Sequence, residues 1–531
     1  MRRALLLALL VVMSSLAVPL AAGAGTAGVD ADPAPSQDDR ESNPTTEDTI
    51  GYVEGYWYDD ELPVDDREGG TVEDEELEAV IYRSMARVEV IRERTFEEPV
   101  PVEVITRAEF ENETGELFVD VDDGDRLVEN VRYEALFAVD RETDVVDEFE
   151  TLYGGAVAGY YEPAEDRIVI VSDTPDEPEL DEVTLGHELQ HALQDQRFGL
   201  DEFDEATVDD YTAVRGLVEG EATLIDVEYE RRCGTEWECV EPSGDGGAPP
   251  GDLNYGLFFG VFHPYSDGPI YVDALREEGG WEAVDAAFDD PPASSAEVIR
   301  PGEERDPAAI DLEDRSNDRW EPLETAEGAD AERFGEATMA AMFMGAAVES
   351  GDGPVARSDV FDSESELSVY NYDHAVTDGW AGDELVAYGT GAGTESETGF
   401  VWRSEWESTA DAEEFAEGYL ALIEANGGDP VEDRRNTYVI DDEFPGAYAL
   451  DVDGETVTIV RAPSVEELSG IYAGAAPEGA DTIDAEPAAD GSGDGDANAT
   501  DSESGDRLAG FGAALAALSI LAMAFATSRR E

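Results

Sequence analysis

Two histidines lie four residues apart in the segment HELQHALQDQ, with a glutamate directly after the first of them. Because an α-helix has about 3.6 residues per turn, His187 and His191 would project from one face and could direct ring nitrogens at a single ion. Glu188 would lie about 100° further round the helix, within reach of a water molecule bound to that ion. This spacing predicts a zinc-binding helix with a built-in general base.

A third ligand is expected from the segment RGLVEGEATLIDVEYE, residues 215–230, whose apolar residues recur at helical spacing. Glu219 and Glu221 lie two positions apart on this second helix, hence about 200° apart, so only one of them can face the ion. We choose Glu219, because Gly220 beside it has no side chain and would let the helix backbone approach the site. Glu221 is the alternative.

These motifs resemble those of the gluzincin group of zinc metallopeptidases, the thermolysin-like class in which two helix histidines and a downstream glutamate bind one Zn²⁺ ion. The likeness rests on HELQHALQDQ and the later EGEA. It implies three metal ligands, His187, His191 and Glu219. It also implies that Glu188 is the general base, and that Asp195, the last residue of the pattern HExxHxxxD, has a second-shell or structural role.

Longer stretches resemble a set of uncharacterised secreted haloarchaeal proteins built round the same helix: GYYEPAEDRIVIVSD, HPYSDGPIYVDALREEGGW and GWAGDELVAY. Peptide hydrolysis needs a hydrogen-bond donor for the carbonyl oxygen that gains negative charge. Tyr265 is our first choice for this donor, because it lies in the second stretch, and His263 and His374 are the alternatives. The apolar run RIVIV, residues 167–171, predicts a strand. By the resemblance it is a candidate for the edge strand that pairs with extended substrate, and an ordinary internal strand is the alternative.

Both ends of the chain carry export and anchoring signals. Arg2 and Arg3 precede an apolar run and then small residues, the pattern of a secretory signal peptide over residues 1–24. Residues 508–527 contain no charge and could cross a hydrocarbon core of roughly 30 Å as a helix. Arginines in the tail, residues 528–531, favour a cytoplasmic C-terminus. We expect an exported cell-surface protein that the C-terminal helix anchors to the membrane.

Residues 25–48 and 476–507 are acidic and poor in apolar residues, which predicts a disordered linker and a disordered stalk. The stalk, the helix beginning AGFG and the terminal arginines resemble the archaeal sorting tails that archaeosortase cuts and exchanges for a lipid. The usual Pro-Gly-Phe is Ala-Gly-Phe at residues 509–511. A plain membrane anchor is therefore the alternative to a lipid.

The formal net charge is −99, from 130 acidic and 31 basic residues. Self-repulsion on this scale opposes folding in dilute buffer, whereas at molar salt the Debye length falls to about 3 Å and screens it. The charge predicts a halophilic, haloarchaeal host. It excludes nucleic acid as a partner, because binding phosphates requires a basic surface.

Two kinds of covalent modification are expected outside the cell. Cys233 and Cys239 are the two cysteines of the chain, and in an exported protein they are expected to form a disulfide. Asn112 and Asn498 each begin an Asn-x-Thr acceptor site for N-glycosylation.

The expected fold class is α+β. Residues 49–356 are predicted to form a zincin-like metallopeptidase region, with helices at residues 75–94 and 331–347. Residues 357–475 are predicted to form a smaller α+β accessory domain, in which the strands LVAYG, GFVWRSEW, YALDV and TVTIV surround a helix at residues 410–425.

Together these features predict an extracellular, membrane-anchored zinc peptidase acting on peptides or proteins. The alternative is a non-catalytic binding or maintenance protein of the cell envelope that retains a structural metal site.

The net charge leads to a first prediction. Dialysis from molar salt into dilute buffer is expected to unfold the protein, because the repulsion between carboxylates is then unscreened. Circular dichroism would show loss of the helical signal and its return when salt is restored. An unchanged spectrum in dilute buffer would contradict the halophilic interpretation.

Overall fold

The computed structural model describes residue 40 and residues 43–483, with gaps at 66, 68, 111–120, 155–158, 176, 202, 204, 243–252, 304, 326–327, 330, 352, 369 and 392–396. The predicted signal peptide, the C-terminal helix with its tail, and both sequons, Asn112 and Asn498, lie outside the described residues, as does most of the predicted linker and stalk. Among the helices that are described, none has both the length and the hydropathy needed to cross a membrane.

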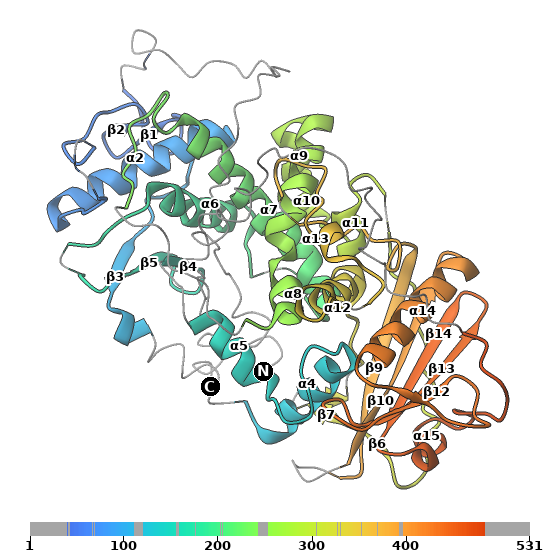
Figure 1. Ribbon diagram of the computed structural model, residues 1–531. Coiled ribbons are helices and arrows are strands. Elements are labelled where there is room, and N and C mark those ends of the chain that lie inside the picture. Colours follow the sequence, from blue (N-terminus) through green and yellow to red (C-terminus); the bar gives the residue numbers. More distant parts are fainter. Residues whose placement is uncertain are drawn as a thin grey trace, which may run out of the picture.

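The described chain is a mixed α+β structure, as the sequence predicts (Figure 1). Its first part comprises β1 (Tyr52–Val53), β2 (Tyr56–Trp57), α2 (Asp74–Arg92), β3 (Val102–Ile105), α4 (Asp123–Ala135), α5 (Val145–Gly154), β4 (Gly159–Glu162), β5 (Arg167–Val171), α6 (Glu182–Phe198) and α7 (Val208–Arg232). Helix α2 matches the helix expected at residues 75–94, and Val80, Met85 and Val88 on its apolar face are buried.

A layer of helices follows: α8 (Tyr255–Ser266), α9 (Gly268–Gly279), α10 (Trp281–Asp289), α11 (Ser295–Ile299), α12 (Gly335–Glu349) and α13 (Arg357–Val360). A short hairpin of β7 (Glu324–Thr325) and β8 (Gly328–Ala329) precedes α12. Helix α12 packs against α8 so closely that a Cβ on Gly345 would lie 2.7 Å from the Cα atom of Gly256. Helix α12 is also tied to this layer by a buried ion pair between Glu336 and Arg300, 2.6 Å apart.

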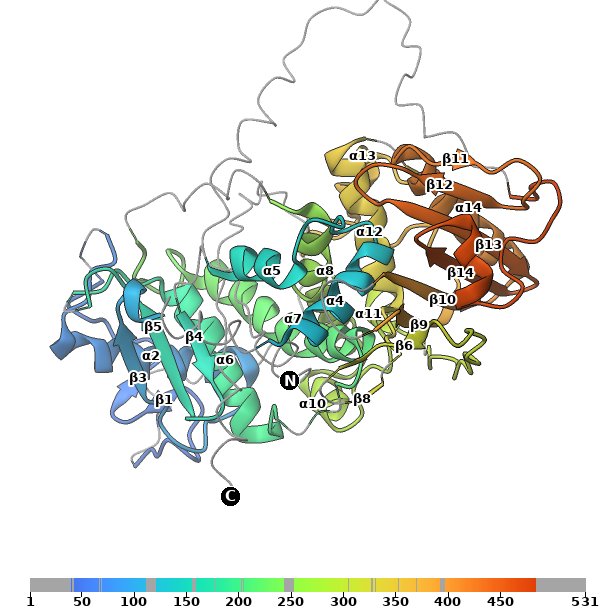
Figure 2. The ribbon, with the colours of Figure 1, turned by 90° about the horizontal axis from the view of Figure 1, so that it is seen from below.

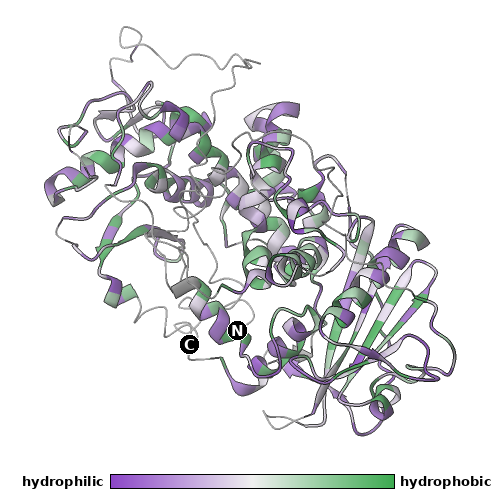
Figure 3. Ribbon diagram, viewed as in Figure 1, coloured by the Kyte–Doolittle hydropathy of each residue, from purple (hydrophilic) through white to green (hydrophobic). Residues whose placement is uncertain are grey.

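The last part is a seven-stranded antiparallel sheet in the order β11-β12-β13-β14-β10-β9-β6. Its strands are β6 (Glu321–Pro322), β9 (Trp380–Gly389), β10 (Thr398–Trp406), β11 (Asp429–Pro430), β12 (Thr437–Ile440), β13 (Gly446–Asp453) and β14 (Thr456–Ala462), with helices α14 (Thr409–Ala425) and α15 (Val465–Ile471) beside them. Four strands and α14 coincide with expected elements, and hydrophobic residues are visible along β10, β13 and β14 (Figure 3). Figure 2 shows this sheet at the opposite end of the molecule from the small sheet of β3, β5 and β4.

Of the two alternatives for RIVIV, the structure shows the internal strand, and the edge-strand candidate is wrong. These residues form β5, which lies between β3, its parallel neighbour, and β4, its antiparallel neighbour. Four consecutive apolar residues, Ile168 to Val171, are buried, which is typical of a strand covered on both faces. The outer strand on the side of α6 is β4, whose four residues are buried.

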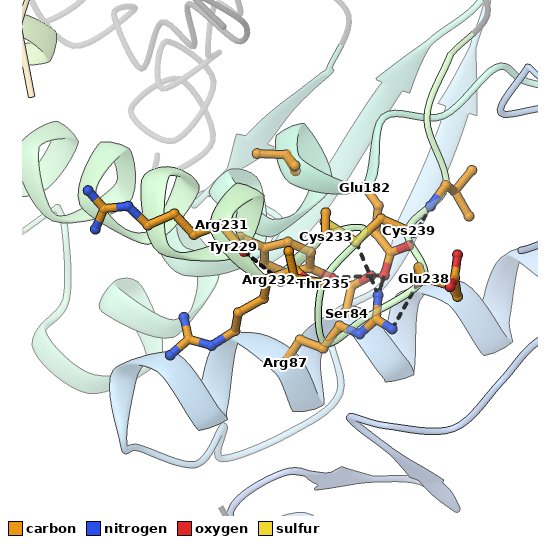
Figure 4. The surroundings of a disulfide bond; sticks show 12 residues. Ser84, Arg87, Glu182, Tyr229, Arg231, Arg232, Cys233, Thr235, Glu238 and Cys239 are labelled. Carbon is orange, nitrogen blue, oxygen red and sulfur yellow. Dashed lines mark hydrogen bonds and ion pairs between the residues drawn. A yellow bond between two sulfur atoms is a disulfide. The ribbon is translucent and has the colours of Figure 1, made fainter. Parts of the chain in front are cut away.

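The first residue of α6 fixes the position of that helix. Glu182 is fully buried and accepts hydrogen bonds from side chains of α2 and α7 and from one backbone amide: Arg83, Ser84, Arg87, Tyr229 and the Val240 N–H. The predicted disulfide between Cys233 and Cys239 forms directly beside this cluster, and Arg87 also donates to the Glu238 carbonyl 3.0 Å away (Figure 4). One carboxylate thereby joins α2, α6, α7 and the disulfide loop.

Helices α7 and α9 cross with their backbones nearly in contact. A Cβ added at Gly220 would lie 2.3 Å from the carbonyl carbon of Gly268, and one added at Gly268 would lie 2.5 Å from the Gly216 oxygen. The reason given for Gly220 from the sequence is therefore wrong: the missing side chain makes room for α9. The position next to Glu219 is constrained by helix packing.

This packing leads to a matched pair of predictions. Gly220→Ala is expected to lower the free energy of unfolding by at least about 1–3 kcal/mol, because its methyl group has no space. Gly260→Ala, in α8, is expected to raise it by about 0.5–1 kcal/mol, because nothing lies within 4 Å of its added Cβ and alanine favours the helix. Guanidinium unfolding in molar salt measures both. Equal effects of the two substitutions would contradict the packing argument.

Candidate metal centre

Helices α6 and α7 bring three buried side chains together. Gly186 allows the close crossing, since a Cβ there would lie 3.0 Å from the ring of Tyr229. His187 Nε2 lies 3.4 Å, and His191 Nε2 3.2 Å, from Glu219 Oε2. One ligand atom from each of these three residues lies within 4.8 Å of the other two, so the group could hold a metal ion.

The two nitrogen–oxygen distances suit a tetrahedral cation. Ligand bonds of about 2.0–2.1 Å give separations of about 3.3–3.4 Å between the ligands of a tetrahedral zinc ion, close to both nitrogen–oxygen distances. Nε2 of His187, Nε2 of His191 and both oxygens of Glu219 are buried and lack hydrogen-bond partners among the described residues. Leaving buried polar atoms unpaired is costly, and a cation between them would remove that cost. Two imidazoles and a carboxylate are a donor set that suits Zn²⁺.

Each imidazole is oriented through its other nitrogen. His187 Nδ1 lies 2.7 Å from Asp226 Oδ2, and His191 Nδ1 lies 2.9 Å from Gln194 Oε1. An acceptor at Nδ1 keeps the proton there and leaves Nε2 available for a metal. Sequence reasoning missed both acceptors. Their spacing was a usable signal, because Asp226 follows Glu219 by seven residues on one helix and Gln194 follows His191 by three.

Ionisation favours metal binding at Glu219. Burial raises the pKa of this carboxyl, but the imidazoles of His191 and His187 outweigh burial and bring the pKa to about 2. Burial lowers the pKa of His187, but the charge of Asp226 and its hydrogen bond raise it well above its usual value. In the absence of a metal, a proton on His187 therefore balances part of the negative charge of these carboxylates.

Glu221, the alternative ligand, lies in a different set of contacts. One of its oxygens pairs with Arg92 of α2, and the other accepts from Gln194 Nε2 at 2.8 Å. Gln194 in turn accepts from His191. Glu221 therefore stabilises the side chain that orients a histidine, while Glu219 faces the histidines themselves.

Glu188 lies beside the three ligands in a buried position. It is 2% exposed, and neither of its oxygens has a hydrogen-bond partner among the described residues. Burial raises its pKa to about 7. The imidazoles of His187 and His191 and the backbone of Tyr161 in β4 act in the opposite direction and lower the pKa. A carboxyl group with a pKa near neutrality can both accept and return a proton at physiological pH.

Asp195 has a structural position. Its carboxylate accepts from the Tyr161 hydroxyl at 2.8 Å and from the Leu200 N–H at 2.9 Å. These bonds join the C-terminal end of α6 to β4. Of the two roles implied by the resemblance, these contacts correspond to the structural one.

The three candidate donors lie in different surroundings. Tyr265 is 7% exposed, and burial raises its pKa well above the usual value, with further contributions from the charges of Glu219 and Glu188. It therefore lies within electrostatic range of the metal centre. His263 is fully buried, packs edge-on against Tyr372 at 5.0 Å, and has its pKa lowered by burial to about 3. His374 is also buried, and burial lowers its pKa.

A buried arginine near the centre was also missed. Arg215 lies four residues before Glu219 on α7, which places both on the same face of the helix. Its guanidinium donates to Glu205 Oε1 at 3.1 Å and lies 5.2 Å from the ring centre of Tyr211. The i, i+4 spacing from a proposed ligand was the signal that could have identified it.

Comparisons with known proteins cover the other end of the chain. Residues 321–472 match the model of a domain of unknown function (DUF8575). This segment begins at β6 and includes α12, the remaining strands of the large sheet and α15, and it contains none of the proposed metal ligands. No curated protein and no solved structure matches the chain.

The hydrogen bonds to the imidazoles lead to a prediction about metal affinity. Asp226→Asn is expected to weaken zinc binding by about 10- to 100-fold, because an amide orients the His187 ring less strongly than a carboxylate. His191→Ala, which removes a ligand, is expected to abolish binding. Titration against a competing chelator measures both. Glu228→Gln, two residues along α7, serves as the control, and a fall of the same size in this variant would contradict the role given to Asp226.

Proposed function

We propose that the protein is a zinc-dependent peptidase of the gluzincin type, with a zincin-like core formed by β3–β5, α6 and α7. The observation that carries the proposal is the placement of Glu188. A buried, unpaired carboxylate with a raised pKa lies next to three mutually facing ligand groups. A purely structural metal site needs the ligands but has no use for this additional acid.

The residues divide the proposed reaction between them. His187, His191 and Glu219 would hold the Zn²⁺ ion, which when bound lowers the pKa of water and polarises a carbonyl oxygen. Glu188 accepts the proton of the attacking water and then transfers it to the leaving amine. Asp226 and Gln194 keep the imidazoles in the required tautomer. Tyr265 is proposed to donate a hydrogen bond to the carbonyl oxygen as its negative charge grows.

Strand β4 is the proposed site for an extended peptide. It is an edge strand and it contacts α6. The backbone of its residue Tyr161 is close enough to Glu188 to lower the pKa of that carboxyl. A peptide that adds to an edge strand gains main-chain hydrogen bonds that do not depend on its sequence. The hydrogen bond from Tyr161 to Asp195 holds this strand against α6.

The cellular setting is proposed from the sequence alone. The signal peptide and the C-terminal apolar helix favour export and attachment to the membrane, either by the helix or by a lipid added after archaeosortase processing. The acidic composition favours a halophilic host. Peptides or proteins outside the cell are then the substrates.

A non-catalytic envelope protein with a structural metal site is the second candidate. The match of residues 321–472 to a domain of unknown function leaves that part of the chain open to a binding role. Both candidates require the metal, and they differ in what Glu188 does.

Glu188→Gln is the deciding substitution. It is expected to abolish hydrolysis of casein in molar salt while zinc content stays at the wild-type level, because the amide cannot accept the proton. A chelator is expected to abolish wild-type hydrolysis as well. Glu277→Gln, on the exposed surface of α9, is the control and should retain full activity. Absence of chelator-sensitive cleavage of casein and of a peptide library by the wild-type protein would favour the non-catalytic candidate.

A further inference from the structure

Asp267 has a buried carboxylate that its own helix does not use. The residue lies between α8 and α9 and is the N-cap residue of α9, but its side chain makes no capping hydrogen bond. An aspartate in this position ordinarily accepts from the first backbone amides of the helix. Asp267 is 7% exposed, and its Oδ2 atom has no hydrogen-bond partner among the described residues. The carboxylate is therefore turned away from the amides of α9.

The surroundings of this carboxylate are rich in oxygen atoms. Ser266, the last residue of α8, forms a hydrogen bond with Asp267, and its Oγ lies 2.5 Å from Ser368 Oγ. The carbonyl oxygen of Tyr370 lies 3.1 Å from Ser368 Oγ and 3.5 Å from Ser266 Oγ. A carboxylate, two hydroxyls and a carbonyl thus lie together, contributed by the α8–α9 junction and by the segment that precedes β9.

This oxygen cluster has too few protons for its acceptors. The Tyr370 N–H donates to Ser368 Oγ, and each serine hydroxyl carries one proton of its own. The two hydroxyl protons must serve the bond between the serines, the Tyr370 carbonyl and the Asp267 carboxylate, so at least one acceptor is left without a donor. An unpaired buried acceptor is costly, and a cation among the oxygens would remove that cost.

A second unsatisfied group lies one helical turn away. His263 precedes Asp267 by four residues, and the Asp267 N–H donates to its carbonyl oxygen, so the two side chains project from one face. His263 is fully buried, and neither of its ring nitrogens has a partner among the described residues. A neutral imidazole needs one donor and one acceptor. Water molecules that hydrate an ion can supply both.

The charges nearby favour a monovalent ion. Burial raises the pKa of Asp267 to about 7, and Asp373 raises it further, whereas Arg300 lowers it. Arg300 itself pairs with Glu336 and Asp373, each at 2.6 Å, so it is not the counter-ion of Asp267. Its charge would repel a divalent ion about twice as strongly as a monovalent one. The C-terminal end of α8 adds partial negative charge, which also attracts a cation.

We propose that the α8–α9 junction binds an alkali-metal cation, Na⁺ or K⁺, through the Asp267 carboxylate, the Ser266 and Ser368 hydroxyls and the Tyr370 carbonyl. Hard cations prefer oxygen ligands of these kinds. The ion would join the end of α8 to the part of the segment 321–472 that contains Ser368. This site shares no residue with the candidate zinc ligands, and the inference does not depend on the proposed peptidase function.

Thermal unfolding at constant ionic strength tests the inference. NaCl, KCl and choline chloride at one molar concentration screen charge equally, but the charge of choline is surrounded by methyl groups that keep oxygen ligands away. The unfolding midpoint of the wild-type protein is expected to be higher in NaCl or KCl than in choline chloride by about 5 °C or more, because an ion that binds only the folded state stabilises it. The salt with the larger effect identifies the ion.

Variants assign this effect to the site. Asp267→Asn is expected to remove the difference between the alkali-metal salts and choline chloride. Ser368→Ala keeps the carboxylate but loses a ligand, so it should reduce the difference, and it serves as the second test if Asp267→Asn does not fold. Asp362→Asn, at an exposed aspartate of the same segment, is the control and should retain the full difference.

Diffraction from crystals grown in RbCl locates the ion directly. An anomalous peak is expected between Asp267 and the two serines in the wild-type protein and should be absent in Asp267→Asn. Equal midpoints of the wild-type protein in the three salts would overturn the inference, and so would a difference that persists in both variants. A requirement for Ca²⁺ that neither Na⁺ nor K⁺ replaces would also contradict it.

Discussion

The interior between α6 and α7 depends on the balance of buried charge. Glu188 and Glu219 lie beside two imidazoles where little water can reach them, and Asp226, whose side chain is 21% exposed, contacts His187 from the rim of this region. Without a metal, a proton on His187 provides part of the balancing charge. A divalent cation held by His187, His191 and Glu219 would balance the same negative charge. Metal binding and stability of the helix pair are therefore expected to be coupled, because both act on one set of charges.

Ion pairs away from the metal hold the two helices in register. Glu182 at the start of α6 joins that helix to α2 and α7, while Arg92 of α2 reaches Glu221 and, through Gln194, the second histidine. The two glutamates around Gly220 therefore have different surroundings: Glu219 faces the candidate metal site, and Glu221 holds the side chain that orients His191. Breaking one partner of such a buried pair is strongly destabilising, so the supporting residues are as constrained as the ligands.

The helical spacing of residues in the sequence was enough to predict part of the candidate site, but not the residues that support it from other helices. The spacing of His187, Glu188 and His191 determines their relative directions on any helix, and the same geometry limits the third ligand to one of Glu219 and Glu221 without deciding between them. The spacing of Asp226 from Glu219 indicated that the two share a face of α7, but its contact with His187 depends on how α6 and α7 cross, which no local pattern specifies. The order of β3, β5 and β4 was missed for the same reason, because β3 comes from residues far earlier in the chain.

Helix α12 belongs to the matched segment by sequence, but it packs against the helical layer that precedes that segment. It lies within residues 321–472, which match the family model. Its Gly345 nevertheless packs against Gly256 of α8, and its Glu336 pairs with Arg300 in the helical layer. A chain consisting of the matched segment alone would expose a largely apolar helix to solvent. In this chain, the helical layer of residues 255–299 covers that face and so completes the packing of the matched segment.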